Sequence, residues 1–262
     1  MDIKEYNVAT THNKQNHPWE YARLNVLLNL IKQHKIVLMG GGVNLLDIGC
    51  GDAFLVTQLS KHLAGGHFYA IDTAFTEYMM ATLREKYPSD NIHFCKNINE
   101  VNVVNGKIDI ILLLDVIEHI ENDIDFLATL HSIAGFSADT SVIITVPAYQ
   151  SLFCSHDVWL GHYRRYTTTL LKKHIEQAGF LPFQAGYFFT SLLLPRLVRK
   201  GKENIFGYNK NNVTGIGDWD GGKIAFWLTK SILNVDYTIS KWMKKLGIKL
   251  PGLSCYCICK SK

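Results

Sequence analysis

The segments LLDIGCGDAFL, from Leu45 to Leu55, and YAID, which ends at Asp72, decide the fold of this chain. The first is an apolar run that breaks at a glycine-containing turn and continues as an amphipathic pattern. The second is another apolar run with a carboxylate at its end. A buried strand, a tight turn, a helix and a second strand in this order form a unit that binds a nucleoside-containing cofactor.

Apolar and amphipathic segments alternate along the chain outside this unit. We expect a helix that begins at Pro18, and strands over 43–48, 67–72, 91–95, 108–114, 141–146, 182–189 and 252–260. Helices are expected over 53–64, 75–87, 122–134 and 167–179. The strands are continuous apolar runs, which indicates that both faces are covered, so we expect a doubly wound, seven-stranded, Rossmann-like α/β sheet with parallel strands.

The C-terminal third has a different pattern, because most of 190–250 is predicted to be helical. We interpret it as an insertion before the last strand, since it is too small and too intertwined to form its own core. The chain is thus expected to be one domain. Its parts are an N-terminal arm and helix (1–42), a cofactor-binding core (43–189), a helical insertion or lid (190–250) and a final strand (251–262).

The bulk composition fits a folded globular protein. The chain has 262 residues, of which 47% are hydrophobic and 19% charged, and its net charge of +4 makes a nucleic-acid partner unlikely without excluding one. The six cysteines form no CxxC pair, so we expect small reduced core residues. The first thirty residues show no signal peptide and the longest uncharged run is short and broken, so we expect a soluble, cytoplasmic protein.

The turn itself argues against a pyrophosphate-containing cofactor. A dinucleotide fingerprint needs a third glycine three residues after Gly51, where this chain has Phe54. Asp47 and Asp52 bracket the turn with negative charge, and carboxylates compete with phosphate for the amides of a helix N-terminus. The pattern favours a ligand that carries positive charge, and S-adenosylmethionine is such a ligand.

LLDIGCGDAFL with YAID resembles motif I and the following acidic strand of class I S-adenosylmethionine-dependent methyltransferases. Three further segments, HPWEYARLN, LLLDVIEHIEND and VPAYQSLFCSHDVWLGHYRRYT, resemble one bacterial branch of that family, many of whose members look linked to glycan or lipid metabolism. The resemblance covers roughly residues 15–190 and the final strand. It implies S-adenosylmethionine as the cofactor.

The resemblance also implies the cofactor-binding residues. The methionine end would lie at Asp47, Gly49 and Gly51, the ribose at Asp72 and the adenine at Asn97, and Asp115 would join this set. Two departures stand out. The family's third glycine is Ala53 here, which we expect to keep a helical backbone, and Asn97 replaces an acidic residue.

Asp115-Val-Ile-Glu118-His119 follows the fourth strand, and three interpretations stay open. Asp115 and Glu118 have the spacing of a capping box. His119 has the chemistry of a general base. Asp115, Glu118 and His119 together have the chemistry of a divalent-metal site, which ubiquinone-pathway and RNA-terminal O-methyltransferases with a similar sequence suggest.

The segment SHDVWLGHYRRYT, after the fifth strand, is expected to be a long loop that forms a substrate wall. His162 is, with His119, our candidate for substrate activation. Arg164 and Arg165 are expected either to pair with carboxylates or to bind an anionic group of the substrate. The remaining candidates for the wall are His156, Tyr163 and Tyr166.

Two helical segments carry less specific signals. Trp19 and Arg23 would close over the cofactor or simply belong to the core. Apolar residues followed by Arg196, Arg199 and further lysines give 190–248 the pattern of a membrane-surface helix, or of a lid or dimer helix. The oligomeric state is left open.

These observations predict methyl transfer from S-adenosylmethionine to a small-molecule acceptor, more often on oxygen than on nitrogen or carbon. Two alternatives remain. One is a metal-assisted RNA 2′-O-methyltransferase. The other is a scaffold that binds the cofactor without catalysis and acts at a membrane or partner through its insertion.

Overall fold

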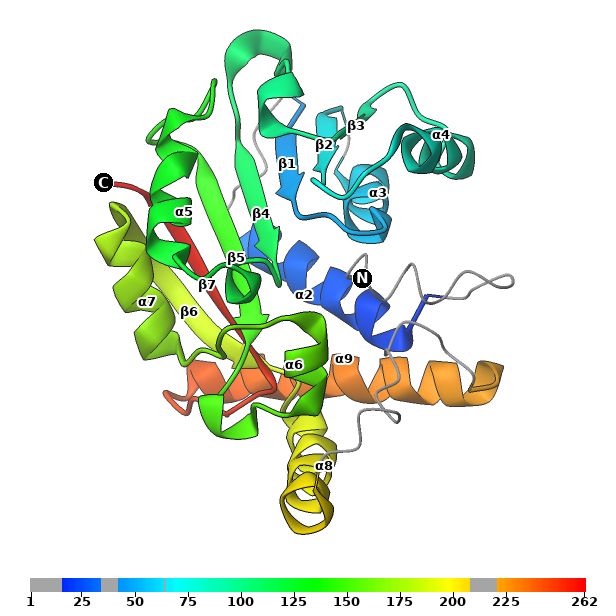
Figure 1. Cartoon of the computed structure of the whole chain (residues 1–262), viewed down its shortest axis with the longest axis vertical. Coiled ribbons are helices and arrows are strands. Elements are labelled where there is room, and N and C mark those ends of the chain that lie inside the picture. The colour runs from blue at the N-terminus through cyan, green and yellow to red at the C-terminus, as the bar shows by residue number, and fades with distance from the viewer. Residues whose placement is uncertain (1–15, 34–41, 64, 208–220) are drawn as a thin grey trace.

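The computed structural model describes residues 16–33, 42–63, 65–207 and 221–262. They form a seven-stranded sheet in the order β3-β2-β1-β4-β5-β7-β6 (Figure 1). The strands are β1 (Asn44–Ile48), β2 (His67–Ile71), β3 (Ile92–Cys95), β4 (Ile110–Leu114), β5 (Ser141–Pro147), β6 (Phe180–Phe188) and β7 (Ser254–Ser261).

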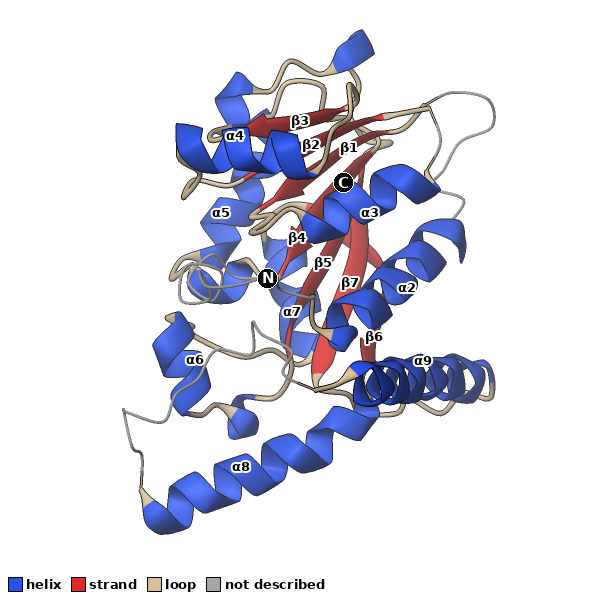
Figure 2. Ribbon diagram, turned by 90° about the vertical axis from the view of Figure 1, so that its right-hand side faces the viewer, coloured by secondary structure: helices blue, strands red, loops and turns tan. Residues whose placement is uncertain are grey.

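Helices cover both faces of the sheet (Figure 2). Side chains alternate along β4: Ile110 and Leu112 pack in the core under α2, α3 and α9, whereas Ile111 and Leu113 pack in the core under α5 and α7. This explains why the strand is apolar throughout. The helices are α2 (Pro18–Gln33), α3 (Phe54–His62), α4 (Glu77–Lys86), α5 (Asp123–Thr129), α6 (Ser155–Leu160), α7 (Thr168–Gln177), α8 (Leu193–Phe206) and α9 (Lys223–Lys245).

The fold class and the seven strands are as predicted, but three details are corrected. β7 runs antiparallel to both β5 and β6, so the sheet is mixed rather than parallel. The chain leaves β6, passes through α8 and α9, and returns between β5 and β6 in the opposite direction. The helix expected over 122–134 ends at Thr129, and the expected loop over 154–167 contains α6.

The predicted insertion forms α8 and α9, which lie at the same end of the molecule in both views (Figures 1 and 2). α9 packs against α2, where Asn25 Nδ2 donates to Asn234 Oδ1 at 2.9 Å and Lys241 Nζ donates to Asn29 Oδ1 at 2.8 Å. No helix in the described part of the chain is long and apolar enough to cross a membrane. In β7, Cys255, Cys257 and Cys259 share one buried side of the sheet, as their alternation predicted.

Candidate active site

The turn after β1 has the backbone that its glycines predict. Gly49 and Gly51 have φ of 75° and 57°, in the left-handed region. A Cβ on Gly49 would lie 2.7 Å from Val116 Cγ2. Gly51 N donates to Asp72 Oδ2 at 3.0 Å, so the turn and the carboxylate after β2 are held together.

Ala53 corrects one expectation about this turn. Its φ of 58° and ψ of 11° place it in the left-handed region at the N-cap of α3, not in a helical conformation. A side chain makes this conformation less favourable than it is for glycine by about 1 kcal/mol. The position therefore keeps the backbone that a third glycine would adopt, although the residue is alanine.

Asp47 is the buried carboxylate of the turn. It lies at 1% exposure in β1, and its Oδ1 atom has no hydrogen-bond partner among the described residues. Burial is the main cause that raises its pKa to about 7, with Asp72 and Asp52 adding to the rise and Arg23 opposing it. A cation bound here would restore the ionised form.

Asp72 and Asn97 follow β2 and β3 at the same edge of the sheet. Asp72 Oδ1 accepts from Ala74 N at 3.0 Å, while its other oxygen accepts from Gly51. Asn97 is exposed, and its side chain accepts from Asn99 N at 3.1 Å. Both residues stand at the carboxyl ends of their strands, where open sheets bind ligands. Their contacts with ribose and adenine stay predictions.

Asp115 follows β4 and is held by α2. Its Oδ2 atom lies 2.8 Å from Arg23 Nη2, and the same nitrogen donates to Thr145 Oγ1 at 2.6 Å. The capping-box interpretation is wrong, because the short 3₁₀ turn that contains Glu118 begins after Val116 and has no side-chain cap. Asp115 has φ of 58°, a strained conformation for a residue other than glycine.

Arg23 is thus part of the carboxyl edge rather than plain core. It is 3% exposed, it links α2 to the ends of β4 and β5, and its guanidinium lies 5.3 Å from the Trp19 ring centroid. Closure of either residue over a cofactor stays a prediction.

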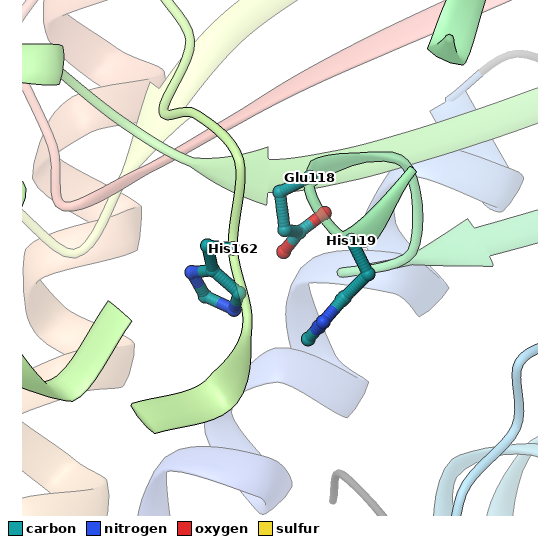
Figure 3. Close-up of side chains that lie close together, drawn as sticks. All are labelled: Glu118, His119 and His162. Carbon is teal, nitrogen blue, oxygen red and sulfur yellow. The ribbon is translucent and has the colours of Figure 1, made fainter. Parts of the chain in front are cut away.

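Glu118, His119 and His162 come together at this edge, and each offers a ligand atom within 4.8 Å of the others (Figure 3). The loops that carry them are joined where Tyr163 N donates to the Glu118 carbonyl at 2.7 Å. The two imidazole rings lie edge to face, 4.5 Å apart. The predicted metal site had Asp115 as its third ligand, whereas the structure brings His162 beside Glu118 and His119.

The Glu118 carboxylate is buried without compensation. It is fully buried, and neither oxygen has a hydrogen-bond partner in the part of the chain that the structure describes. Burial and then the nearby Asp115 raise its pKa well above the ordinary range. Burial therefore favours the protonated acid, and a cation bound beside Glu118 would favour the carboxylate.

Asp157, which the sequence did not single out, positions His162. Its Oδ1 atom lies 3.0 Å from His162 Nδ1 and accepts from Arg165 Nε at 2.9 Å. Its Oδ2 atom accepts from Cys154 N at 2.8 Å and pairs with Arg196. Although burial opposes ionisation, the bonds from His162 and Arg165 dominate and hold the Asp157 pKa well below its usual range.

Most of the expected substrate wall is structural. Arg164 pairs with Asp123 at 3.0 Å, Arg165 is buried against Asp157, and Tyr166 is fully buried with its hydroxyl 2.6 Å from Asp123 Oδ2. Both arginines therefore pair with carboxylates, which is the first of the two predicted alternatives. Tyr163 alone of the named residues is more than half exposed.

His156 is also not part of an exposed wall. It is 5% exposed, stacks on the Trp159 ring, and burial followed by Arg196 lowers its pKa to about 4. It is therefore a neutral core residue at physiological pH.

Comparisons with known proteins relate the core of this chain to methyltransferases. Residues 46–135 match a family model described as a methyltransferase domain. A ubiquinone biosynthesis O-methyltransferase from Rickettsia bellii is 28% identical over 108 residues, which are 41% of this chain and 43% of the relative. A mitochondrial protein of the same name from Dictyostelium discoideum is 27% identical over 122 residues, 42% of this chain and 38% of the relative. These matches thus span less than half of the curated relatives.

Two solved structures share the fold at low identity. Coclaurine N-methyltransferase, bound to N-methylheliamine and S-adenosylhomocysteine, has a TM-score of 0.54 at 13% identity. The match covers 92% of this chain and 70% of that enzyme. Phosphoethanolamine N-methyltransferase 2 from Haemonchus contortus, in complex with S-adenosylmethionine, has a TM-score of 0.52 at 16% identity. The match covers 89% of this chain and 52% of that enzyme. The sheet is therefore the Rossmann-like fold of S-adenosylmethionine-dependent methyltransferases, and residues 46–135 match a methyltransferase domain.

Proposed function

We propose that this protein transfers the methyl group of S-adenosylmethionine to a hydroxyl oxygen of a small molecule. The observation that carries the proposal is the Asp47 carboxylate, buried and short of a partner beside the Gly49–Gly51 turn. A ligand with an ammonium and a sulfonium supplies the missing positive charge, whereas a pyrophosphate would add repulsion. The names of the curated O-methyltransferase relatives support oxygen as the acceptor atom.

The cofactor is tested by titration calorimetry with S-adenosylhomocysteine and NAD. We expect binding of the first and none of the second. Asp72→Ala should lose at least about tenfold in affinity, because a charge-assisted contact to the ribose contributes about 1.4 kcal/mol or more. Asp90→Ala, in an exposed loop, is the control that should bind normally. Binding of NAD alone would refute the proposal.

The catalytic step needs a base for the acceptor hydroxyl. Asp157 accepts the Nδ1 proton of His162, which leaves Nε2 of the neutral ring able to take the hydroxyl proton. As the oxygen forms its bond to the methyl carbon, the carbon–sulfur bond breaks and its electron pair returns to sulfur. The proton ends on His162, where the ionised Asp157 stabilises the imidazolium.

Transfer of a labelled methyl group to 3,4-dihydroxybenzoate, used as a phenolic probe, tests this step. His162→Gln should lower kcat by about 10²–10⁴ while S-adenosylhomocysteine affinity stays unchanged. Transfer to a short RNA instead of the phenol would favour the RNA alternative. Cofactor binding without transfer to any hydroxyl compound would favour the scaffold.

A divalent cation at Glu118, His119 and His162 is the second candidate for activating the hydroxyl. The carboxylate without hydrogen bonds favours it, because one acidic oxygen and two imidazoles suit a transition-metal ion. Such an ion, when bound, would orient the acceptor and lower the pKa of its hydroxyl. Glu118 and the imidazoles would hold it, and Asp157 would orient His162.

Calorimetric titration with Zn²⁺ and Mg²⁺, alongside activity in the presence of a chelator, separates the two candidates. If the ion is required, Glu118→Gln abolishes both metal binding and transfer. If His162 acts as a base alone, a chelator has no effect and Glu118→Gln keeps most of the activity, since the protonated acid and the amide have similar shapes.

A further inference from the structure

A cavity of about 390 Å³ lies between α7, the β6–β7 pair and α9, and it shares no lining residue with the candidate active site. Its wall carries a strong excess of positive charge. Five lysines face one carboxylate, that of Glu176; the lysines are Lys172, Lys173, Lys241, Lys244 and Lys249. None of the ion pairs formed within the described residues includes any of these lysines.

Hydroxyl donors line the same cavity. Tyr237 and Ser240 are 5% and 9% exposed, and their oxygens have no hydrogen-bond partner in the described chain. Tyr256 Oη already accepts from Gln184 Nε2 at 2.9 Å and from Lys244 Nζ at 3.2 Å, so its proton is left to donate. Burial raises the pKa of Tyr237, which keeps that hydroxyl protonated.

We propose that this cavity binds the phosphate group of a small anionic ligand. Its free capacity consists of ammonium and hydroxyl donors, and a phosphate offers only acceptors and negative charge. Buried hydroxyls without partners are costly unless a ligand satisfies them. The volume lies within the range of small-molecule sites, about 300–1,000 Å³.

The test is titration calorimetry with inorganic pyrophosphate and, in a separate arm, with a water-soluble short-chain phosphatidic acid. Binding of the first identifies a free phosphate compound, and binding of the second alone identifies a lipid headgroup. The double variant Lys172→Gln with Lys249→Gln should weaken binding of whichever ligand binds by about tenfold or more. Ser240→Ala should weaken it by a smaller factor. The control pair is Lys61→Gln with Lys86→Gln, which removes the same charge elsewhere. No binding, or loss equal to that of the control pair, would overturn the proposal.

A second, independent observation concerns the outer face of α9. One side of this helix, with Phe226, Leu233 and Tyr237, is buried in the protein. The opposite side carries apolar residues at helical spacing that are 49–79% exposed: Ile224, Leu228, Ile232, Val235, Ile239 and Trp242. We call these six residues the outer stripe of α9. Packing in the core explains why the buried side of α9 is apolar, but it does not explain the outer stripe.

Charge indicates what covers the outer stripe. Apart from the buried Arg196, α8 and α9 carry eight lysines and arginines and only two acidic residues, Glu203 and Asp236. A second copy that docked through the same face would bring these like charges together. An anionic surface would complement them.

We infer that the outer stripe of α9 binds the surface of an anionic phospholipid bilayer. The helix would lie in the interface, with its apolar side chains among the acyl chains and Lys223 and Lys245, which are exposed and do not line the cavity, near the headgroups. α8, which lies at the same end of the molecule (Figure 2), also carries exposed apolar residues, among them Leu194, Val198 and Ile205. Arg196, which the sequence placed in the basic flank, is instead buried against Asp157.

Flotation with vesicles of phosphatidylcholine, with and without phosphatidylglycerol, tests the inference. Binding is expected only to the mixed vesicles and should weaken with salt. Leu228→Asp with Val235→Asp should abolish it, whereas Val158→Asp with Leu181→Asp, two equally exposed apolar sites elsewhere, should not. A wild-type dimer that the first pair dissociates, with no vesicle binding, would assign the surface to a second copy and overturn the inference.

Discussion

Two buried carboxylates at the carboxyl edge of the sheet, Asp47 and Asp157, have opposite surroundings. Asp157 accepts hydrogen bonds or ion pairs from His162, Arg165, Arg196 and a backbone amide, and its pKa is held low. Asp47 has an oxygen without a partner, and its pKa is raised to about 7. The comparison separates a carboxylate whose partners come from the protein from one whose partner must come from a ligand.

The largest effect should come from Asp157→Asn. The change leaves the Arg165 and Arg196 guanidiniums buried without their countercharge, so we expect a loss of about 3–5 kcal/mol in the free energy of unfolding. Urea denaturation measures it. Asp139→Asn, which breaks the exposed pair with Lys107, is the control and should cost less than about 1 kcal/mol. If the two variants lost equal free energy of unfolding, the buried partners of Asp157 would contribute no more than an exposed ion pair, which would contradict the prediction.

Asp47→Asn, in contrast, should increase the free energy of unfolding of the protein without cofactor. A carboxyl whose pKa is about 7 when folded and 3.8 when unfolded binds more protons in the folded state. Its contribution to stability therefore falls as pH rises from about 4 to about 7. The amide does not titrate, so at pH 8 the variant should be more stable by up to about 4 kcal/mol.

The measurement for Asp47→Asn is a series of denaturation curves from pH 4 to 8, together with S-adenosylhomocysteine titration. The difference in free energy of unfolding between the variant and wild type should widen from about pH 4 to about pH 8. The variant should also bind S-adenosylhomocysteine more weakly than wild type. Parallel pH profiles would show that Asp47 already has its countercharge within the protein.

Gly49→Ala tests the turn beside Asp47. The new Cβ would lie 2.7 Å from Val116 Cγ2 at a φ of 75°, so we expect a loss of about 2 kcal/mol by thermal or urea unfolding. Val116→Ala in the same chain should restore part of that loss, because it removes the clash but not the backbone strain. An unchanged stability would show that the turn adjusts freely.

The smallest effect is expected for Ala53→Gly, which should stabilise the protein by about 1 kcal/mol because φ is 58°. Ala70→Gly, in β2, is the matched control and should destabilise it by about the same amount. A loss at both positions would mean that the packing of the Ala53 methyl group outweighs the strain.

The sheet could be predicted from the sequence because its strands are continuous apolar runs whose length and flanking turns are local signals. The direction of β7 could not, since it depends on where the path through α8 and α9 brings the chain back. The left-handed backbone of Ala53 was also missed, because alanine carries no signal for it.

The candidate site also contains residues that local spacing could predict and residues that only the fold brings together. Asp47, Gly49, Gly51 and Asp72 lie close together because one turn and one strand connect them, so spacing was sufficient. The group around His162 needs side chains from three separate segments, and Arg196 reaches Asp157 from a helix 39 residues later. Asp157 is the single acid in a segment of histidines, tyrosines and arginines, and its role became visible only when the fold brought Arg196 to it.

The position of β7 between β5 and β6 also constrains how the protein is made. Among the strands that the structure describes, β6 pairs with β7 alone, and β7 follows α9 in the chain. During synthesis the first five strands can assemble as they leave the ribosome, whereas β6 has to wait, without a backbone partner, until β7 has emerged. The edge that carries α7 and α9 is therefore the last to close, and it is the part of the nascent chain that most needs protection from aggregation.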